Sequence, residues 1–373
     1  MRRAQTLALE VINRILFSES SPNPGGQELQ LLQQMVVFAS RQIEVKLACR
    51  PGSGIHAAAL ERGLDVVPVP FRNSLHVPSI NMIRRLINRW RPVAVVSNSG
   101  HDANVCGLAA RLLKNRPRLV RVRTYQHGIP HAWTYNWLSD LTLVPSQNLR
   151  NRILRNPRID PDRIHILYPG LDFDHLAAQA GQPLPGAADS WLKARPGRLL
   201  VHAAMLRPEK GHLFMLDVLA RLLPDFPDLR YVIAGEGEQR GVIEHRVRDL
   251  GMEAHVLLAG MLQPVAPLLK RAALVIMPSF FEPLGMAQIE ALSLGIPVVA
   301  SNVDGIPETI THQKTGLLAE AGNLQAWQDA IGWALGHAEQ MQAMAQAGRA
   351  DVLARFSSEA NAHRFLDFVS DLL

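Results

Sequence analysis

The sequence predicts an α/β protein built from two doubly wound domains. Its 373 residues exceed what one hydrophobic core usually holds, because cores stop growing at about 250–300 residues. Short β-branched runs alternate with helical patterns in both halves of the chain, which is typical of βαβ units and parallel sheets. A segment rich in Pro and Gly interrupts this alternation near the middle. Ligands of such sheets bind at the carboxyl ends of the strands, so we expect the site in a cleft between the two domains.

The first half of the chain predicts a series of strands with helices between them. The expected strands are Thr6–Ile15, Ile43–Cys49, Asp65–Val69, Val93–Asn98, Leu119–Thr124, Leu141–Val144 and Ile164–Tyr168. The helical stretches include Gln27–Ser40, Ser79–Trp90 and Ala103–Leu113. In the first of these helices, apolar residues between Leu29 and Ala39 recur every three or four positions and form one face.

The beginning of the chain shares a basic start and an apolar run with signal peptides. Glu10, Asn13 and Arg14 interrupt the run, however, and no small-residue cleavage site follows. No stretch approaches the roughly 20 apolar residues that are needed to span a bilayer. We therefore expect a strand at this position and a soluble, cytoplasmic protein.

The break in the rhythm covers residues 169–197, which contain several prolines and glycines and predict a linker. After it, the expected strands are Leu199–Ala203, Tyr231–Ala234, His255–Leu258, Leu274–Met277 and Pro297–Ala300. The expected helices are His212–Leu223, Gln239–Leu250, Val265–Arg271, Met286–Leu294 and a helical tail over Gln325–Leu373. Several of the strands are continuously apolar, as expected for strands covered on both faces.

These patterns predict the domain organisation. An N-terminal Rossmann-like domain covers residues 1–170, a linker covers 171–197, and a C-terminal Rossmann-like domain covers 198–355. The last residues, 356–373, predict a helix that can cross back to the N-terminal domain.

The charge balance is basic, with a formal net charge of +6. Arg and Lys residues cluster in three stretches of the first half, between Arg84 and Arg91, Arg111 and Arg123, and Arg150 and Arg163. No helix-turn-helix, zinc-finger or aromatic RNA-binding pattern accompanies them, so we expect no nucleic-acid partner. We expect instead a basic face that meets an anionic glycolipid or the inner face of the cytoplasmic membrane, with a merely solvated face as the alternative. The two cysteines, Cys49 and Cys106, lie beside apolar runs and predict buried thiols.

The strongest motif reads PSFFEPLGMAQIEALSLGIPVVASNVDGIPETITHQKTGLL and begins at Pro278. A predicted strand ends just before it, Glu282 follows in a loop, and a helix opens near Met286 with Glu290 in its first turns. A helix N-terminus presents unpaired N–H groups, which suit a phosphate. Carboxylates on either side of it accept hydrogen bonds from sugar hydroxyls.

Two further motifs follow strands of the second half. In MLRPEKGH, Arg207 and Lys210 project from one loop beside a helix start, which suits a diphosphate leaving group whose charge grows as a glycosidic bond breaks. In AGEGE, Gly235 permits either a tight turn or a close backbone approach to a ligand.

Together these motifs resemble the retaining glycosyltransferases of family 4 (glycosyl transferases group 1). Their GT-B architecture implies two facing Rossmann-like domains, an inter-domain cleft and a helical C-terminal tail. In that family a Glu is followed by seven residues and a second Glu, as Glu282 and Glu290 are here. Lys210 matches the family's Lys. Where family members usually have GRL, this sequence has AML, so the Arg stands further along, at Arg207. The resemblance is strong over Ala203–Leu318 and looser in the first half.

The resemblance implies roles for these residues. Glu282 would hold hydroxyls of the transferred sugar, Glu290 the nucleotide ribose, and Arg207 with Lys210 the diphosphate. Further donor-binding residues would be Gly235, Glu236, Pro283, Leu284, Gly285 and Met286.

In the first half, PGGQE resembles the family's GGxE loop, which implies that Gly25 and Gly26 let the backbone approach the donor phosphates. The sequence RVRTYQHGIPHAW carries His127 where family members commonly have a His near the reacting carbon, and His131 is the competitor.

The sequence SNSGHDAN closes a neighbouring strand, and its His101 and Asp102 are candidates for the acceptor side. Asp172 and Asp174 have the Asp-x-Asp spacing of metal sites in another glycosyltransferase architecture, but here they lie in the linker, where YPGLD resembles the family's PNGID hinge. We expect no metal and no cofactor, because the cations and helix ends supply the charge that a metal would.

The expected function is transfer of a sugar, with retention of anomeric configuration, from a nucleotide-diphosphate-sugar to a saccharide or glycolipid acceptor in bacterial cell-envelope polysaccharide or lipopolysaccharide core synthesis. One alternative is a nucleotide-sugar epimerase or phosphorylase of the same architecture. A second is an NAD-dependent oxidoreductase, although no Gly-x-Gly-x-x-Gly follows any strand. The third is a non-catalytic nucleic-acid or membrane binder, against which the intact glutamates and Lys210 argue.

Overall fold

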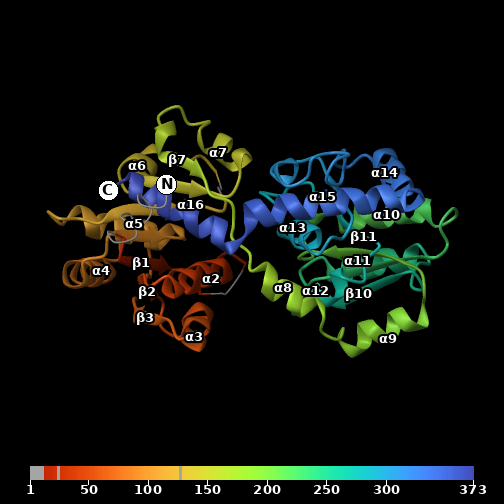
Figure 1. Ribbon diagram of the computed structural model, residues 1–373, viewed down its shortest axis with the longest axis horizontal. Coiled ribbons are helices and arrows are strands. Elements are labelled where there is room, and N and C mark those ends of the chain that lie inside the picture. Colours follow the sequence, from red (N-terminus) through yellow and green to blue (C-terminus); the bar gives the residue numbers. More distant parts are fainter. Residues whose placement is uncertain (1–11, 23–25, 126–127) are drawn as a thin grey trace. The chain divides into compact units, whose positions relative to one another are not determined.

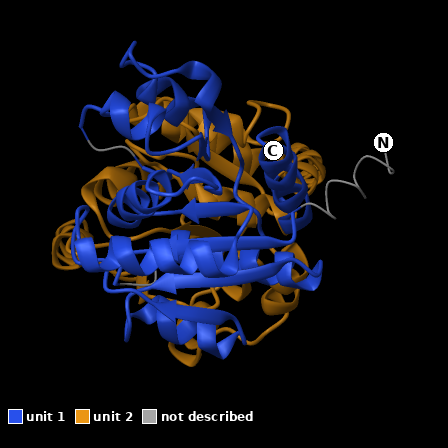
Figure 2. Ribbon diagram, turned by 90° about the vertical axis from the view of Figure 1, so that its left-hand side faces the viewer, with its two compact units in different colours: residues 1–171, 356–373 blue, residues 172–355 orange. Residues whose placement is uncertain are grey.

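The computed structural model describes residues 12–22, 26–125 and 128–373. The chain divides into two compact units (Figure 2). Unit 1 contains the residues up to Leu171 together with Phe356–Leu373, and unit 2 contains Asp172–Arg355. The C-terminal segment 356–373 therefore belongs to the same unit as the N-terminal half.

Unit 1 has, among its described residues, a sheet of seven parallel strands in the order β3-β2-β1-β4-β5-β6-β7 (Figure 1). The strands are β1 (Arg14–Glu19), β2 (Glu44–Cys49), β3 (Asp65–Pro68), β4 (Ala94–Ser97), β5 (Arg118–Val122), β6 (Leu141–Val144) and β7 (Ile164–Ile166). Its helices are α2 (Gly26–Ser40), α3 (Gly54–Glu61), α4 (Val77–Trp90), α5 (Gly100–Arg111), α6 (Ala132–Asn136), α7 (Gln147–Ile153), the 3-10 turn η1 (Pro161–Arg163) and α16 (Ser358–Asp371). The order of the strands is that of a doubly wound sheet.

Unit 2 repeats this plan with six parallel strands in the order β10-β9-β8-β11-β12-β13. The strands are β8 (Arg198–Ala203), β9 (Leu229–Ala234), β10 (Val256–Gly260), β11 (Leu274–Met277), β12 (Val298–Ser301) and β13 (Leu317–Ala319). The helices are α8 (Phe173–Ala180), α9 (Gly186–Ala194), α10 (His212–Leu222), α11 (Arg240–Asp249), α12 (Ala266–Leu269), α13 (Met286–Ser293), α14 (Leu324–Gly336) and α15 (Ala338–Phe356), with the 3-10 turns η2 (Pro208–Lys210) and η3 (Ile306–Glu308). The predicted α/β class with two Rossmann-like halves and a helical tail is confirmed.

Continuously apolar strands form the middle layer of each unit. All four residues of β4 and of β11 are buried, because helices cover both faces of the sheets. In unit 2, Trp327 of α14 is the largest fully buried side chain and packs edge-on against Phe214 of α10. The sheets are therefore rigid supports for the loops at their carboxyl ends.

The helix α16 completes the core of unit 1, although it is the last helix of the chain. Phe365 is fully buried, and its ring centroid lies 5.3 Å from that of Phe38 on α2. The Asn361 amide donates a 2.6 Å hydrogen bond to the carbonyl of Tyr168, and the Leu171 N–H donates to the Phe356 carbonyl at 2.8 Å. These contacts explain why the final residues group with the N-terminal half.

The structure corrects several details of the expected elements. The first strand is β1, Arg14–Glu19, and shares only two residues with the predicted Thr6–Ile15, whose start lies outside the described residues. The segment 171–197, predicted as a linker, forms the helices α8 and α9 within unit 2. Asp172, considered above for a metal, caps α8 by accepting the His175 N–H at 2.9 Å. Strand β13 and helices α3, α6 and α7 were missed, because each is short and has little periodicity.

In each sheet the strand order reverses at one point. In unit 1 the reversal lies between the adjacent strands β1 and β4, and in unit 2 between β8 and β11. The connections that follow the two strands of such a pair run in opposite directions, so a crevice opens at the carboxyl ends of the pair. This crevice is the usual ligand position in doubly wound sheets. None of the helices in the described part of the chain combines the length and apolar character of a membrane span.

We predict that Phe365→Ala lowers the free energy of unfolding of unit 1 by about 3–5 kcal/mol, because it leaves a cavity against Phe38 in a close-packed core. Chemical denaturation followed by circular dichroism measures this change. The exposed Asp367 on the same helix provides the control, and Asp367→Ala should stay within about 0.5 kcal/mol of the wild type. Equal stability of the two variants would show that α16 is not part of this core.

Candidate active site

The reversal point of unit 2 is occupied by an ion pair. The Lys210 Nζ lies 2.7 Å from the Glu282 Oε2, and both side chains are largely buried, at 17% and 11% exposure. Lys210 follows β8 and Glu282 follows β11, and these two strands are neighbours in the sheet. The structure thus brings together two predicted site residues that are 72 positions apart in the sequence.

Tight backbone packing sets the position of Lys210. Gly211 has a φ of 74°, and a Cβ there would lie 2.1 Å from the carbonyl oxygen of Pro278, so only glycine fits. The Phe280 N–H donates to the Glu209 carbonyl at 2.8 Å and joins the two loops a second time. Arg207, the other predicted cation, is exposed on the same loop and forms no ion pair with any described residue.

Two hydrogen bonds join the loop of Glu282 to the loop after β12. The Glu282 N–H donates to the Asp304 carboxylate at 3.1 Å, and the Gly305 N–H donates to the Glu282 carbonyl at 3.1 Å. A Cβ on Gly305 would lie 1.9 Å from the carbonyl oxygen of Pro283, so the close approach requires glycine at this position. The carboxylate is therefore positioned by its backbone as well as by Lys210.

Helix α13 begins directly after this loop. Gly285 has a φ of 91°, and the Gln288 side chain occupies the space that a Cβ on Gly285 would need. The Gln288 amide donates to the carbonyl of Leu284 at 2.8 Å and to the hydroxyl of Thr309 at 3.1 Å. Gly285 makes no side-chain cap hydrogen bond at this helix start, and a helix N-terminus is a position that suits an anion.

Glu290 lies within α13 and is partly accessible. Its carboxylate makes no hydrogen bond or ion pair with another residue in the described ranges. Desolvation raises its pKa to about 7, from a usual value of 4.5. A hydroxyl donor that arrived here would favour the ionised carboxylate, because hydrogen bonds to the charged form lower the pKa.

The glycine-rich turn after β9 packs on the loop that carries Lys210. A Cβ on Gly235 would lie 1.9 Å from the Ala204 carbonyl oxygen, and the Leu206 N–H donates to the Glu236 carbonyl at 2.9 Å. The Glu236 carboxylate pairs with Arg240 at the start of α11. Gly235 thus has a packing role in the structure, and Glu236 presents its backbone to the Lys210 loop.

Sequence reasoning missed two histidines beneath Lys210. His202 of β8 and His212 of α10 stack with ring centroids 4.1 Å apart, and both are buried. Burial lowers the pKa of His212 to about 4 and that of His202 well below its usual value, so both rings are neutral near pH 7. The His202 ring also hydrogen-bonds the Tyr231 hydroxyl at 2.8 Å. Neutral rings support the Lys210 loop without repelling its charge.

The reversal point of unit 1 carries two buried carboxyl groups. Asp102 is fully buried and accepts hydrogen bonds from the hydroxyls of Ser18 and Ser20 and from the N–H groups of Asn98 and Ser99, at 2.9–3.1 Å. It therefore joins β1 to the start of α5 instead of lining a hollow, in contrast to the acceptor role considered for it.

Glu19 is the second buried carboxyl group. Its Oε1 accepts hydrogen bonds from the Ser21 N–H, at 2.7 Å, and from the Ser99 hydroxyl. Burial, with the nearby charge of Asp102 as the next cause, raises its pKa to about 8. Burial also raises the pKa of Asp102, to about 6. The pair therefore retains a proton at neutral pH, because two adjacent buried carboxylates cannot both ionise.

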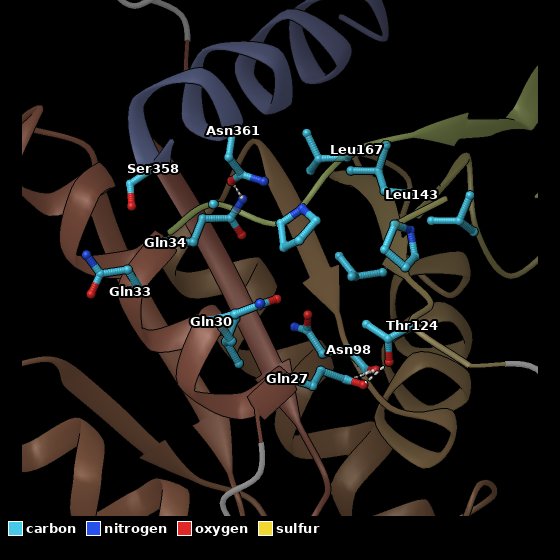
Figure 3. Close-up of a pocket in the computed structure, with 16 residues that line it drawn as sticks. Gln27, Gln30, Gln33, Gln34, Asn98, Thr124, Leu143, Leu167, Ser358 and Asn361 are labelled. Atoms are coloured by element: carbon cyan, nitrogen blue, oxygen red, sulfur yellow. Dashed lines mark hydrogen bonds between the residues drawn. The ribbon is translucent and has the colours of Figure 1, made fainter. Parts of the chain in front are cut away.

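Unit 1 has a small hollow at the carboxyl ends of β4 to β7, with a volume of about 60 Å³ and a lining of amide and apolar side chains. Figure 3 shows Gln27, Gln30 and Gln34 of α2 pointing toward it, and Asn361 of α16 at its rim. The Gln27 amide donates to the Asn98 carbonyl at 2.6 Å, and the Gln34 amide donates to the Asn361 carbonyl oxygen at 2.9 Å. We call this the glutamine hollow. Its uncharged amides suit neutral hydroxyl groups.

A larger hollow of about 570 Å³ opens beside it and is lined by His101 and His131, among others. Both histidines are exposed, and the His101 ring hydrogen-bonds the Ser74 hydroxyl at 2.9 Å. Gly26 is the first residue of α2. Two predicted site residues, Gly25 and His127, lie outside the described residues. In the described ranges no three His, Cys, Asp or Glu side chains gather in a way that could hold a metal ion.

The comparisons with known proteins agree with this arrangement. Residues 24–175 match the family model Glycosyltransferase Family 4, and residues 188–351 match the model Glycosyl transferases group 1. The two matches cover one unit each, in the order that the GT-B architecture requires. The chain belongs to the group 1 glycosyltransferases of GT-B architecture.

The chain is also similar to individual proteins, both curated relatives and solved structures. The chain is 34% identical over 239 residues to a D-inositol 3-phosphate glycosyltransferase of Segniliparus rotundus, a match that covers 61% of this chain and 51% of the relative. The chain thus spans about half the length of the curated relatives it matches. Two solved structures, a glycosyltransferase of Rickettsia africae and HepE of Anabaena in complex with UDP, align with TM-scores of 0.86 and 0.82 at 17% and 20% identity. Each alignment covers 96% of this chain and 98% or 100% of the other, which shows a shared fold.

We predict that the stability of unit 1 falls as the pH rises through the range set by Glu19. The folded-state pKa of about 8 exceeds the usual 4.5, so the folded state holds the proton more tightly than the unfolded state. The resulting stabilisation is complete below about pH 4.5 and is lost as the pH rises through about 8. In the Glu19→Gln variant, the pH-dependent change in the free energy of unfolding should be smaller by about 1 kcal/mol or more.

Denaturation at several pH values measures this effect. The exposed Glu61 at the end of α3 is the matched control, and Glu61→Gln should keep the wild-type slope. A slope that is unchanged in Glu19→Gln would contradict the assignment of the buried proton.

We predict that Gly305→Ala displaces the Glu282 loop, because the new Cβ would meet the Pro283 carbonyl oxygen. The free energy of unfolding of unit 2 should fall by about 1–3 kcal/mol. Gly241 in α11 faces open space, and Gly241→Ala should stabilise the helix by up to about 1 kcal/mol. Chemical denaturation of both variants, followed by circular dichroism, measures these changes, and wild-type stability in Gly305→Ala would refute the strain argument.

Proposed function

We propose that this protein transfers a sugar, with retention of anomeric configuration, from a nucleotide-diphosphate-sugar to a saccharide or glycolipid acceptor. The observation that carries the proposal is the pairing of Lys210 with Glu282 at the point of unit 2 where the strand order reverses, directly before the start of α13. A cation, a carboxylate and a helix start converge there, and these are the groups that a diphosphate and a sugar require.

Each donor group has a matching chemical partner. The diphosphate is suited to the first-turn N–H groups of α13 and to Lys210, whose ammonium has three donors and can keep Glu282 while it binds a phosphate oxygen. Glu282 then offers its remaining acceptor positions to hydroxyls of the transferred sugar. Glu290, with no hydrogen-bond partner in the described ranges, is suited to the ribose hydroxyls. The structural relative HepE was solved with UDP, which supports a nucleotide as the donor's leaving group.

The mechanism follows from the role of Glu282. A carboxylate that is engaged by a lysine and by sugar hydroxyls is a poor nucleophile, so the two-carboxylate route of retaining glycosidases is not favoured here. In the proposed reaction, the bond between the anomeric carbon and the diphosphate oxygen breaks, and the acceptor oxygen bonds to that carbon on the same face. The departing diphosphate takes the acceptor's proton, while Lys210 and Arg207 stabilise its growing charge without a metal ion. The enzyme contributes positioning and electrostatics.

The proposed acceptor belongs to the bacterial cell envelope. Among the similar solved structures is WaaG, a glycosyltransferase involved in lipopolysaccharide biosynthesis, at 14% identity and a TM-score of 0.68. The relative at 34% identity is named for D-inositol 3-phosphate. Both names support a polyhydroxylated acceptor, which the glutamine hollow of unit 1 is suited to receive.

Contact with an anionic membrane surface is supported by one face of unit 1. Ile129, Trp133 and Trp137 are 80%, 50% and 47% exposed, and the two Trp ring centroids lie 6.4 Å apart. Arg155 and Arg158 are exposed and line a hollow together with Ile129. Aromatic and basic side chains on one surface suit the lipid–water interface. The proposed location is therefore the cytoplasm, at the inner face of the membrane.

The decisive experiment screens nucleotide-sugars by calorimetry and then follows transfer to acceptors by NMR, which reads the anomeric configuration of donor and product. We predict that Lys210→Ala and Glu282→Ala each lower turnover by at least about tenfold while the fold is kept, because each loses a charged contact made to the leaving group or sugar. The control is Lys270→Ala, which removes an exposed lysine of the same unit and should leave turnover unchanged.

Three outcomes contradict the proposal. Near-normal transfer in both active-site variants would remove the assigned roles. Consumption of the nucleotide-sugar without any acceptor would favour an epimerase, and inversion of the configuration would exclude the retaining mechanism.

A further inference from the structure

The larger hollow of unit 1 is cationic. It has a volume of about 570 Å³ and lies at the carboxyl ends of β1, β2, β4 and β5, beside the point where the strand order reverses. Three arginines from two strand ends line it, namely Arg50, Arg121 and Arg123. We call it the arginine hollow.

Arg121 is the most unusual of the three. It is only 8% exposed, it lies in β5, and its guanidinium stacks over the Tyr135 ring at 4.9 Å from the ring centroid. Its Nε is shielded from solvent and has no hydrogen-bond partner among the described residues. A guanidinium in this position has lost most of its hydration without gaining a carboxylate, and this arrangement is costly unless an anion completes it.

The other two arginines share this condition. The Nε atoms of Arg50 and Arg123 are also buried without a partner, and neither side chain forms an ion pair with a described residue. In the described part of the chain, the Arg50 guanidinium donates only to the Phe71 carbonyl, at 2.8 Å. By contrast, Arg111 and Arg116 in the same unit both pair with Asp140. The positive charges of the arginine hollow are therefore not compensated in the way that others in this unit are.

The two buried carboxyl groups nearby compensate this charge only in part, because Asp102 attracts Arg121 without forming an ion pair with it. Asp102 directs its oxygens to hydroxyl and N–H groups of Ser18, Ser20, Asn98 and Ser99, and neither oxygen contacts an arginine. Glu19 holds a proton at neutral pH, because burial raises its pKa to about 8. The hollow therefore keeps a net positive charge.

We propose that the arginine hollow binds a phosphate monoester on the acceptor, with Arg121, Arg123 and Arg50 as its ligands. Three cations around one hollow exceed what a neutral sugar or a single carboxylate needs, whereas they match a dianionic group with three terminal oxygens. This inference rests on the proposed function, since it assigns the hollow to the acceptor of that reaction.

The neighbouring glutamine hollow fits the same acceptor. Asn98 and Thr124 line the glutamine hollow, and the adjacent residues Ser99 and Arg123 line the arginine hollow. The loops after β4 and β5 thus present the uncharged side chains of Asn98 and Thr124 on one side, as Figure 3 shows, and the guanidinium of Arg123 on the other. An acceptor that carries both hydroxyls and a phosphate would engage both.

The experiment measures binding of inorganic phosphate, a hexose 6-phosphate and the same uncharged hexose to the full chain by isothermal titration calorimetry. We expect the two phosphates to bind, with an affinity that falls as the salt concentration rises, and the uncharged hexose to bind at least about tenfold more weakly. Vesicles of phosphatidylcholine with and without phosphatidic acid test whether the phosphate is part of a lipid. Binding confined to the vesicles with phosphatidic acid would identify a lipid headgroup as its source.

Two variants keep the test independent of folding. The Arg123 side chain is partly accessible to solvent. The Arg123→Gln variant should weaken phosphate binding by about tenfold or more, which is the loss expected for one charge-assisted hydrogen bond. Arg121→Gln should do the same where it folds. Arg84 on α4 is exposed and remote from the lining of the hollow, so Arg84→Gln makes the same charge change and should keep wild-type affinity.

The outcomes separate this inference from the proposed function. UDP titration reports on unit 2, and all three variants should bind UDP as the wild type does. Phosphate affinity that falls equally in Arg123→Gln and Arg84→Gln, or no phosphate binding in a protein that binds UDP, would overturn the inference and leave the proposed function standing. Phosphate binding in a protein that binds no nucleotide would contradict the proposed function and leave the phosphate site standing.

Discussion

The ion pair between Lys210 and Glu282 is the interaction on which the site of unit 2 depends. It joins the loops that follow two adjacent strands, and both partners are largely removed from water. Such a pair gains little net stability, because the loss of hydration offsets most of the attraction between the charges. Its value lies in geometry, since the attraction holds a cation and a carboxylate side by side at the edge of the sheet where a helix begins. A ligand with a phosphate and a hydroxyl group finds both partners already in place.

The glycines around this pair show how the position is maintained. Gly211, Gly235 and Gly305 each bring one loop so close to a neighbouring carbonyl that a Cβ would overlap with it. The loops after β8, β9, β11 and β12 therefore form a single packed layer on the carboxyl edge of the sheet. A site that must recognise charge as it develops gains from such rigidity, because no reorganisation is needed at the moment of reaction. The neutral histidine stack beneath Lys210 adds support without adding charge.

Unit 1 uses the same sheet topology for different chemistry. Its reversal point holds protonatable carboxyl groups that join the strands internally, and the groups that face outward are amides and guanidiniums. The contrast between the units is one of charge. Unit 2 pairs its buried cation with a carboxylate, whereas unit 1 leaves three arginines without a carboxylate partner in the described ranges. The same architecture thus carries the proposed donor site in one half and the hollow proposed for an anionic acceptor in the other.

Local patterns in the chain were enough to establish the α/β class, most strands, and the two separate motifs that carry Lys210 and the pair Glu282 and Glu290, because apolar periodicity, glycines and loop motifs act over a few residues. They were not enough to place β1, to recognise that residues 171–197 fold as α8 and α9, or to show that Asp102 is an internal hydrogen-bond acceptor. Those outcomes depend on contacts between residues that are far apart in the chain. The same holds for the His202–His212 stack and for the arginine hollow, since burial and the lack of an ion-pair partner among the described residues arise only once strands from distant parts of the chain lie side by side.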